Sequence, residues 1–337
     1  LAQSYDFFFF INYNFKFNIT FLISILLIQS CSFQDEKVVG NRIEVFNKNL
    51  VFEDEKKNIK SFFPKAKVVE EWNSSFGNSY GFQFNYKFEG QYKIFWKKNI
   101  DKSKIFLTPL ISDNKIFTIT ENGNVVSLNT DGKEIWRTNI IPVDEKGSFL
   151  TGGGITLSAS KVIVTTSFGD IIALSKEDGK ILWRSNFDGS FNMGATIFDK
   201  KIYLISSKGL ALCLSSDGEI IWSFLGPYEK RSIINEPSPV IIDENILFPF
   251  NTGFLKLVNS KTGDEIWKFE SENFDFGNAR SVIQGFSSSM IITENQILTS
   301  TFSGHTRAID FKGNLIWSNK FNSNDDIIHI NEKIFLI

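Results

Sequence analysis

The chain is 337 residues long, and its 36 basic and 38 acidic residues leave a formal net charge of -2. This near balance lacks the basic excess with which nucleic-acid binding proteins neutralise phosphates, and we expect no nucleic-acid partner. Hydrophobic residues make up 42% of the chain, enough for a sizeable core, which excludes global disorder. Two cysteines and two histidines leave little material for metal sites, cysteine nucleophiles or a disulfide framework.

The N-terminal part of the chain carries a segment typical of export. Residues 19–28 form an almost unbroken apolar run of ten. Such a run is too short for a membrane-spanning helix of about 20 residues, but it fits the roughly 7 to 15 residues of a signal-peptide core. It leads to Ile28, Ser30 and Cys31, an aliphatic and a small residue before a cysteine, which resembles a bacterial lipobox. Two interpretations stay open: Cys31 is lipid-modified, or residues 1–30 are a plain secretory signal.

Lipidation at Cys31 would anchor the protein without spanning the membrane, because acyl chains add about 0.8 kcal/mol per buried CH₂. The residue after the cysteine is Ser32 rather than aspartate, which favours the outer membrane. We therefore expect a lipoprotein signal peptide at residues 1–30, a lipidated N-terminus and tether at 31–70, and the folded domain at 71–337. Because the chain begins with Leu1 rather than Met, we expect its start to be imprecise.

Five copies of one short pattern recur along the chain, each with a glycine four residues before a tryptophan. The pairs are Gly132 and Trp136, Gly179 and Trp183, Gly218 and Trp222, Gly263 and Trp267, and Gly313 and Trp317. Counted from Trp96, the tryptophans are 40, 47, 39, 45 and 50 residues apart. Four short strands in about 40 to 50 residues are typical of one blade of a β-propeller.

Short apolar stretches fill each copy and predict strands. One stretch precedes a second glycine, and another lies between the two glycines. The first set comprises residues 116–119, 162–165, 202–205, 246–250 and 297–301; the second comprises residues 125–128, 171–174, 210–214, 254–258 and 306–309. We expect the glycines to supply the positive φ of two-residue turns and the tryptophan rings to lie buried between neighbouring blades.

The repeat carries a family resemblance. The form Ala-Leu-Asp-x-x-x-Gly-x-x-x-Trp, kept most nearly at residues 173–183 and 308–317, resembles the repeat of pyrroloquinoline-quinone-type propellers. Within that superfamily the chain resembles the BamB family, lipoproteins of the outer-membrane β-barrel assembly machinery. Further stretches that carry the resemblance are residues 42–45, 71–77, 151–155 and 236–239. The resemblance implies an all-β propeller of four-stranded blades, eight in the full-length protein, with about six represented here and the C-terminal part truncated.

The superfamily also raises an enzymatic alternative, a quinoprotein dehydrogenase that uses pyrroloquinoline quinone and calcium. Those enzymes commonly carry a pair of adjacent cysteines near the cofactor, whereas this chain has Cys31 and Cys213. Cys213 falls at a small-residue position of the repeat and indicates a buried filler. No loop offers the six to eight oxygens that calcium requires. We therefore expect no catalytic residue, no metal and no cofactor.

The other hypothesis is a binding scaffold, for which residues 140–151, 226–239 and 271–287 provide long connections. The resemblance implies docking on the periplasmic POTRA domains of the barrel-inserting subunit, beside other assembly-complex lipoproteins, at the periplasmic face of the outer membrane. It leaves open direct binding of unfolded outer-membrane proteins. Within residues 226–236 we expect the partner-binding residues Tyr228, Arg231, Ile233, Ile234 and Glu236. An extracytoplasmic sensor or binding module is a third alternative.

Overall fold

The computed structural model describes residues 71–74, 93–105, 107–229, 237–270, 284–321, 327–330 and 333–335. All of them belong to one compact unit, Lys60–Ile337. Cys31, the expected signal peptide and the expected tether lie outside the described residues.

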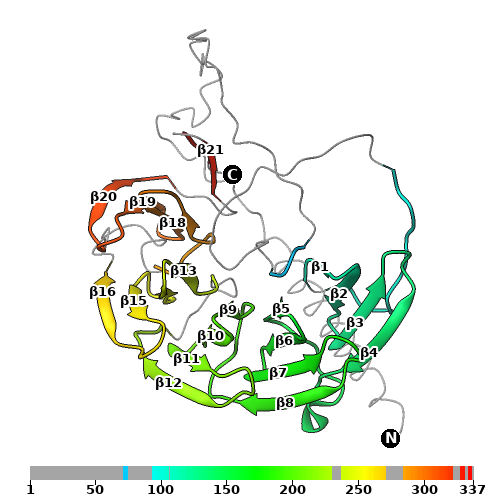
Figure 1. The fold of residues 1–337 in the computed structure, drawn as a ribbon. Helices are drawn as coiled ribbons and strands as arrows, with labels where there is room; N and C mark the ends of the chain where they lie inside the picture. The colour runs from blue at the N-terminus through cyan, green and yellow to red at the C-terminus, as the bar shows by residue number, and fades with distance from the viewer. Residues whose placement is uncertain are drawn as a thin grey trace, which may run out of the picture. The chain divides into compact units, whose positions relative to one another are not determined.

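The described residues form five four-stranded antiparallel sheets, which follow one another in chain order (Figure 1). The first sheet has β1 (Leu110–Ser112), β2 (Lys115–Ile119), β3 (Asn124–Asn129) and β4 (Glu134–Asn139), and the second has β5 (Gly153–Leu157), β6 (Lys161–Thr166), β7 (Asp170–Ser175) and β8 (Ile181–Asn186). The third has β9 (Thr196–Phe198), β10 (Lys201–Ile205), β11 (Leu210–Leu214) and β12 (Ile220–Leu225). The fourth has β13 (Val240–Ile242), β14 (Asn245–Pro249), β15 (Leu255–Asn259) and β16 (Glu265–Phe269), and the fifth has β17 (Ile291–Ile292), β18 (Ile297–Thr301), β19 (His305–Ile309) and β20 (Leu315–Asn319). A two-stranded pair, β21 (Ile328–Ile330) and β22 (Lys333–Phe335), follows them.

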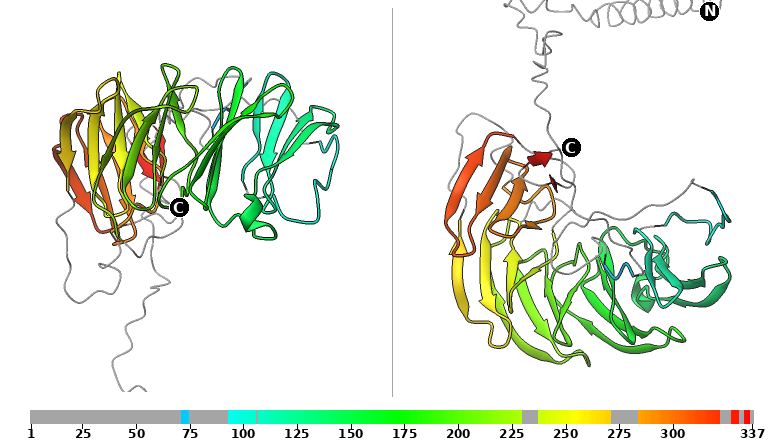
Figure 2. Two further views of the ribbon diagram at one scale, coloured as in Figure 1. Left: turned by 90° about the horizontal axis from the view of Figure 1, so that it is seen from below. Right: turned by 45° about the horizontal axis from the view of Figure 1, so that its top comes forward.

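The expectation of an all-β chain with four-stranded repeats is confirmed for these five sheets. Each apolar stretch predicted before the second glycine corresponds to the second strand of a sheet, and each stretch between the glycines corresponds to the third strand. A short 3-10 helix, η1 (Val143–Glu145), interrupts the connection between the first two sheets (Figure 2).

The glycine turns are longer than predicted. Gly132 and Gly179 do have positive φ, 78° and 72°, but their turns span four and five residues, 130–133 and 176–180. Two-residue turns join the first and second strands of the first, third and fourth sheets instead, and at Asp113 and Asn114 both residues have positive φ. Asp and Asn reach this conformation more easily than other side chains and suit the tight hairpin turn. The expectation that the repeat glycines belong to two-residue turns was therefore wrong.

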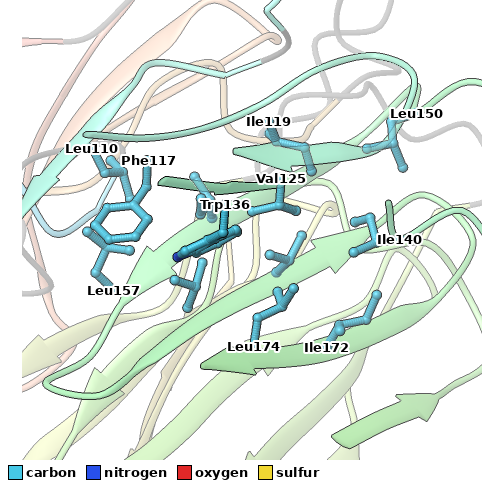
Figure 3. Packing of buried hydrophobic residues seen from close by; sticks show 13 residues of the cluster. Leu110, Phe117, Ile119, Val125, Trp136, Ile140, Leu150, Leu157, Ile172 and Leu174 are labelled. Carbon is cyan, nitrogen blue, oxygen red and sulfur yellow. The ribbon is translucent and has the colours of Figure 1, made fainter. Parts of the chain in front are cut away.

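Apolar side chains fill the space between neighbouring sheets. Between the first and second sheets, Phe117 and Trp136 lie against Leu157 and Leu174 in one buried cluster (Figure 3). Three further clusters lie between successive sheets, and a fifth joins the last four-stranded sheet to Ile327 and to the strand pair after it. Because one sheet cannot cover its own apolar face, each sheet depends on its neighbour for burial.

The first strands of neighbouring sheets also touch. β1 contacts β5, and β9 contacts β13. Residues 71–74 join the first two sheets at these strands: the Trp72 N–H donates to the Ile111 carbonyl at 2.7 Å, and the Leu157 N–H donates to the Asn73 carbonyl at 2.8 Å. The chain that follows the expected tether is thereby hydrogen-bonded to β1 and β5.

Candidate partner-binding face

Each sheet has two ends with different connections. At one end lie the turns between first and second strands and the glycine turns before the fourth strands; we call this end the turn face. At the other end lie the turns between second and third strands, such as residues 120–123 and 206–209, and the links to the next sheet, such as residues 140–152 and 226–239. We call this end the connection face. The two faces follow from the antiparallel order of the strands within each sheet.

The turn face repeats one contact from sheet to sheet. The tryptophan rings of the first four sheets each lie against the turn glycine of the next sheet, and each Nε1–H donates to a backbone carbonyl of that same turn. The acceptors are Lys176 for Trp136 (3.2 Å), Ser216 for Trp183 (3.0 Å), Ser260 for Trp222 (3.2 Å) and Phe311 for Trp267 (2.8 Å). Each contact joins two sheets through burial and a hydrogen bond.

The turn glycines are required for two reasons. At Gly218 φ is 85°, and a Cβ added there would stand 2.7 Å from Cδ2 of Trp183. A side chain would therefore strain the backbone and displace the ring. Trp317 belongs to the fifth sheet and packs with Ile327 and Ile334. The tryptophans and glycines of the repeat thus hold neighbouring parts of the fold together.

Residues 93–100 contact the first sheet in the same way as the fourth strand of one sheet contacts the sheet that follows it. Trp96 lies against Gly132, and its Nε1–H donates to the Thr130 carbonyl at 2.7 Å. Arg137 donates to the Ile100 carbonyl at 2.9 Å, as Arg184 donates to the carbonyl of Ile140, the residue after β4. These contacts place residues 93–100 where the fourth strand of a preceding sheet would lie, on the side of the first sheet that faces away from the second sheet.

Hydrogen bonds and packing hold the start of the connection after β12. The Gly226 N–H donates to the Gly209 carbonyl at 2.9 Å, and a Cβ at Gly226 would clash with the ring of Phe250. The side-chain amide of Asn251 pairs with the backbone of Glu229: its Oδ1 accepts from the Glu229 N–H at 2.9 Å and its Nδ2 donates to the Glu229 carbonyl at 3.2 Å. The turn between β14 and β15 therefore holds the start of this connection.

The same connection is fixed where it reaches the fourth sheet. Ser238 Oγ donates to the Gly194 carbonyl at 2.8 Å, and Thr196 Oγ1 donates to the Pro239 carbonyl. Along the chain, residues 230–237 separate Glu229 from Ser238. The connection thus starts near the outer strand of the third sheet and ends at the first strand of the fourth sheet.

Of the five partner-binding residues expected from the sequence, the structure describes Tyr228, which is 45% exposed. Arg231, Ile233, Ile234 and Glu236 lie outside the described residues. The fixed ends of the connection were not found from the sequence, because Asn251 acts on a residue 22 positions away and no local pattern marks it.

Other exposed side chains lie on the connection face. Val143 on η1 and Phe149, both in the connection between the first and second sheets, are exposed apolar residues. In the third sheet Lys208 pairs with Asp188, with Nζ 2.5 Å from Oδ1. Apolar, aromatic and charged side chains are therefore exposed together on this face, as at many protein interfaces.

The described cysteine is a buried side chain. Cys213 is buried, and burial raises the pKa of its thiol to about 11, so the thiol is protonated at neutral pH.

Within the parts of the chain that the structure describes, no group of three or more His, Cys, Asp or Glu residues gathers at a metal-binding distance. Among those residues no helix is long and apolar enough to cross a membrane.

Repeated four-stranded antiparallel sheets, joined by tryptophans that rest on the turn glycines of the next sheet, define a β-propeller with quinoprotein-like repeats. The family described as outer membrane protein assembly factor BamB matches residues 121–337. The chain belongs to this family.

Individual proteins are similar to the chain at low identity. The outer membrane protein assembly factor BamB of Yersinia pestis is 23% identical over 68% of this chain, and the chain spans 61% of the length of that relative. The crystal structure of BamB from Moraxella catarrhalis matches 65% of this chain and 66% of that protein, with a TM-score of 0.58 and 16% identity. A quinohemoprotein alcohol dehydrogenase from Comamonas testosteroni matches 76% of this chain and 50% of its own, with a TM-score of 0.60 and 14% identity. At these identities the structural likeness shows the fold alone.

Proposed function

We propose that the chain is a non-catalytic scaffold of the outer-membrane β-barrel assembly complex, docking through its connection face on the periplasmic POTRA domains of the barrel-inserting subunit. The observation that carries the proposal is the connection after β12, held at one end by Asn251 and at the other by Ser238. A loop with fixed ends loses less conformational entropy on binding than a free loop. Membership of the BamB family supports the identity of the partner.

The proposal includes lipid anchoring at Cys31 on the periplasmic face of the outer membrane. An anchor confines the scaffold to the surface where its partner sits and raises the effective concentration, so that a modest interface suffices. Labelled palmitate should enter the wild-type protein and not the Cys31→Ala variant. Equal labelling of the two proteins would remove the anchor from the proposal and leave docking to be judged separately.

Docking is tested by substitutions in residues 226–236. Arg231→Glu combined with Ile233→Asp should weaken capture of the purified POTRA domains by at least tenfold without unfolding the sheets. The matched control is Lys146→Glu combined with Phe149→Asp, a charge reversal and an apolar-to-acidic change in the connection between the first and second sheets. Capture that is unchanged in the first variant, or weakened equally in both, would contradict docking through the connection after β12.

The enzymatic alternative has its own assay. A quinoprotein dehydrogenase would reduce a redox dye with an alcohol or sugar after addition of pyrroloquinoline quinone and calcium. The scaffold proposal expects no dye reduction above that of free quinone. Turnover that depends on the protein would replace the proposal with the dehydrogenase.

A further inference from the structure

The fourth strand of every sheet is an edge strand. Within the described part of the chain, β4, β8, β12, β16 and β20 each pair with a third strand on one side and with no strand on the other (Figure 1). An edge strand exposes backbone N–H and C=O groups that can pair with a strand of another protein, and proteins commonly protect such edges with charges or bulges.

Half of each edge is interrupted by a bulge. In all five sheets the pairing between the third and fourth strands shifts by one residue just before the tryptophan. The residue that precedes the tryptophan therefore has no residue opposite it on the third strand. These bulged residues are Ile135, Leu182, Ile221, Ile266 and Ile316. A bulge breaks the regular spacing that an added strand needs. The part of the edge open to pairing is therefore the segment after each tryptophan, which runs towards the connection face.

The outward-facing groups of that segment in β12 follow from its ladder. Gly226 is opposite Gly209 and donates its N–H to it, and hydrogen-bonded pairs alternate along an antiparallel ladder. Phe224 therefore directs its N–H and C=O towards β11, whereas Ser223 and Leu225 direct theirs away from the sheet. Two residues thus present backbone donors and acceptors at the free edge.

The five edges differ in the residues at these two outward positions. They are Arg137 and Asn139 in β4, Arg184 and Asn186 in β8, Ser223 and Leu225 in β12, Lys268 and Glu270 at β16, and Ser318 and Lys320 at β20. Four of the five edges therefore carry a charged side chain, which opposes pairing with another strand. The edge of β12 carries none.

The ends of these edges differ as well. Asn139 and Asn186 fold back on their own sheets, where Nδ2 donates to the carbonyls of Asn122 at 2.8 Å and Phe168 at 3.0 Å. Leu225 takes the same place in β12 and is 74% exposed. The β12 edge is thus uncharged and carries an exposed leucine, and it leads into the connection that carries Tyr228.

We propose that the edge of β12 at residues 223–225 accepts an extended strand of the docking partner. The occupant is a strand whose backbone pairs with Ser223 and Leu225 and whose apolar side chain lies against Leu225, with Tyr228 contacting the strand end. Because the edge has no charge, a strand with uncharged residues at the paired positions fits it. This inference rests on the proposed function and names the element that makes the main-chain contact.

The test is a proline at the edge. Ser223→Pro removes an outward N–H and no N–H of the β11–β12 ladder, and edge strands tolerate proline at such positions. The matched control is Ser318→Pro, which makes the same change at the equivalent position of β20. With purified POTRA domains as probe, we expect Ser223→Pro and Leu225→Lys each to weaken binding at least tenfold, and Ser318→Pro to bind like wild type.

Amide exchange of the wild-type protein gives a second readout that needs no substitution. In the complex, the amides of Ser223 and Leu225 should exchange at least tenfold more slowly, while that of Phe224, which faces β11, changes little. Unchanged exchange at Ser223 and Leu225, or wild-type binding by a folded Ser223→Pro variant, would overturn strand addition and leave docking intact. Failure of the wild-type chain to bind the POTRA domains would overturn the proposed function itself.

Discussion

The two faces of the sheets differ in what they repeat. On the turn face one contact, a tryptophan ring on a turn glycine with an Nε1 hydrogen bond, joins sheet after sheet. On the connection face the links differ in length and in their exposed residues, from Val143 to Tyr228. A contact that recurs from one copy to the next serves the stacking that these copies share. A feature that differs between copies, such as Leu225 at the β12 edge, can serve one partner.

The largest effect on stability should come from a turn-face tryptophan. Trp222 packs against Tyr203, Phe224 and Phe248, with ring centroids 5.9, 6.0 and 6.0 Å away. Trp222→Ala should lower the free energy of unfolding by about 3–5 kcal/mol, because it opens a cavity between the third and fourth sheets. Urea titration followed by circular dichroism measures this. A loss below about 1 kcal/mol would contradict the conclusion that the turn-face tryptophans hold the sheets together.

A smaller loss is expected at a turn glycine. Gly218→Ala combines φ of 85° with a Cβ 2.7 Å from the Trp183 ring, and should cost about 2–3 kcal/mol. The control is Gly304→Ala on the connection face, where φ is 93° and no atom lies within 4 Å of the added Cβ. That variant carries backbone strain alone and should cost about 1 kcal/mol. Equal losses in the two variants would show that the ring contact adds nothing.

The position of the repeat glycines and tryptophans could be predicted from spacing, because each copy repeats the same local geometry. Spacing also predicted the second and third strands. It did not reveal the bulge at Ile135 and its equivalents, which depends on how two strands pair. Nor did it reveal the Asn251 contact, whose partners Glu229 and Ser207 lie 22 and 44 residues away. Comparing the residue three positions after each tryptophan would have singled out Leu225 from the sequence.

One carboxylate on the connection face should add stability that depends on pH. Burial would raise the pKa of Asp101, but hydrogen bonds from Ser103, Asn124 and Thr120 outweigh it and lower this pKa to about 2. Because the folded-state pKa lies below the unfolded value, the carboxylate stabilises the fold above about pH 4, and this contribution of about 2 kcal/mol is lost as the pH falls towards 2.

The measurement compares the free energy of unfolding of wild type and Asp101→Asn near neutral pH and at about pH 2.5. Wild type should be more stable near neutral pH, and the difference between the two proteins should shrink at the acidic pH. A difference that stays constant would contradict the role given to the Asp101 carboxylate.

The smallest effect on stability should come from the β12 edge. Leu225 is 74% exposed, so Leu225→Lys should change the free energy of unfolding by less than about 0.5 kcal/mol. Thermal unfolding compared with wild type checks this. A marked loss of stability would mean that Leu225 packs within the fold, and the contrast between the two faces would then be less sharp.

We propose that the connection face of the third and fourth sheets binds the partner, whereas the turn face holds the sheets together. Deuterium exchange of the full chain, measured with and without the purified POTRA domains, tests it most directly. With the POTRA domains bound, we expect slower exchange in peptides that cover residues 206–209, 223–229 and 250–253. Slower exchange centred on the turn-face residues 215–219 and 260–264, or no change anywhere, would contradict it.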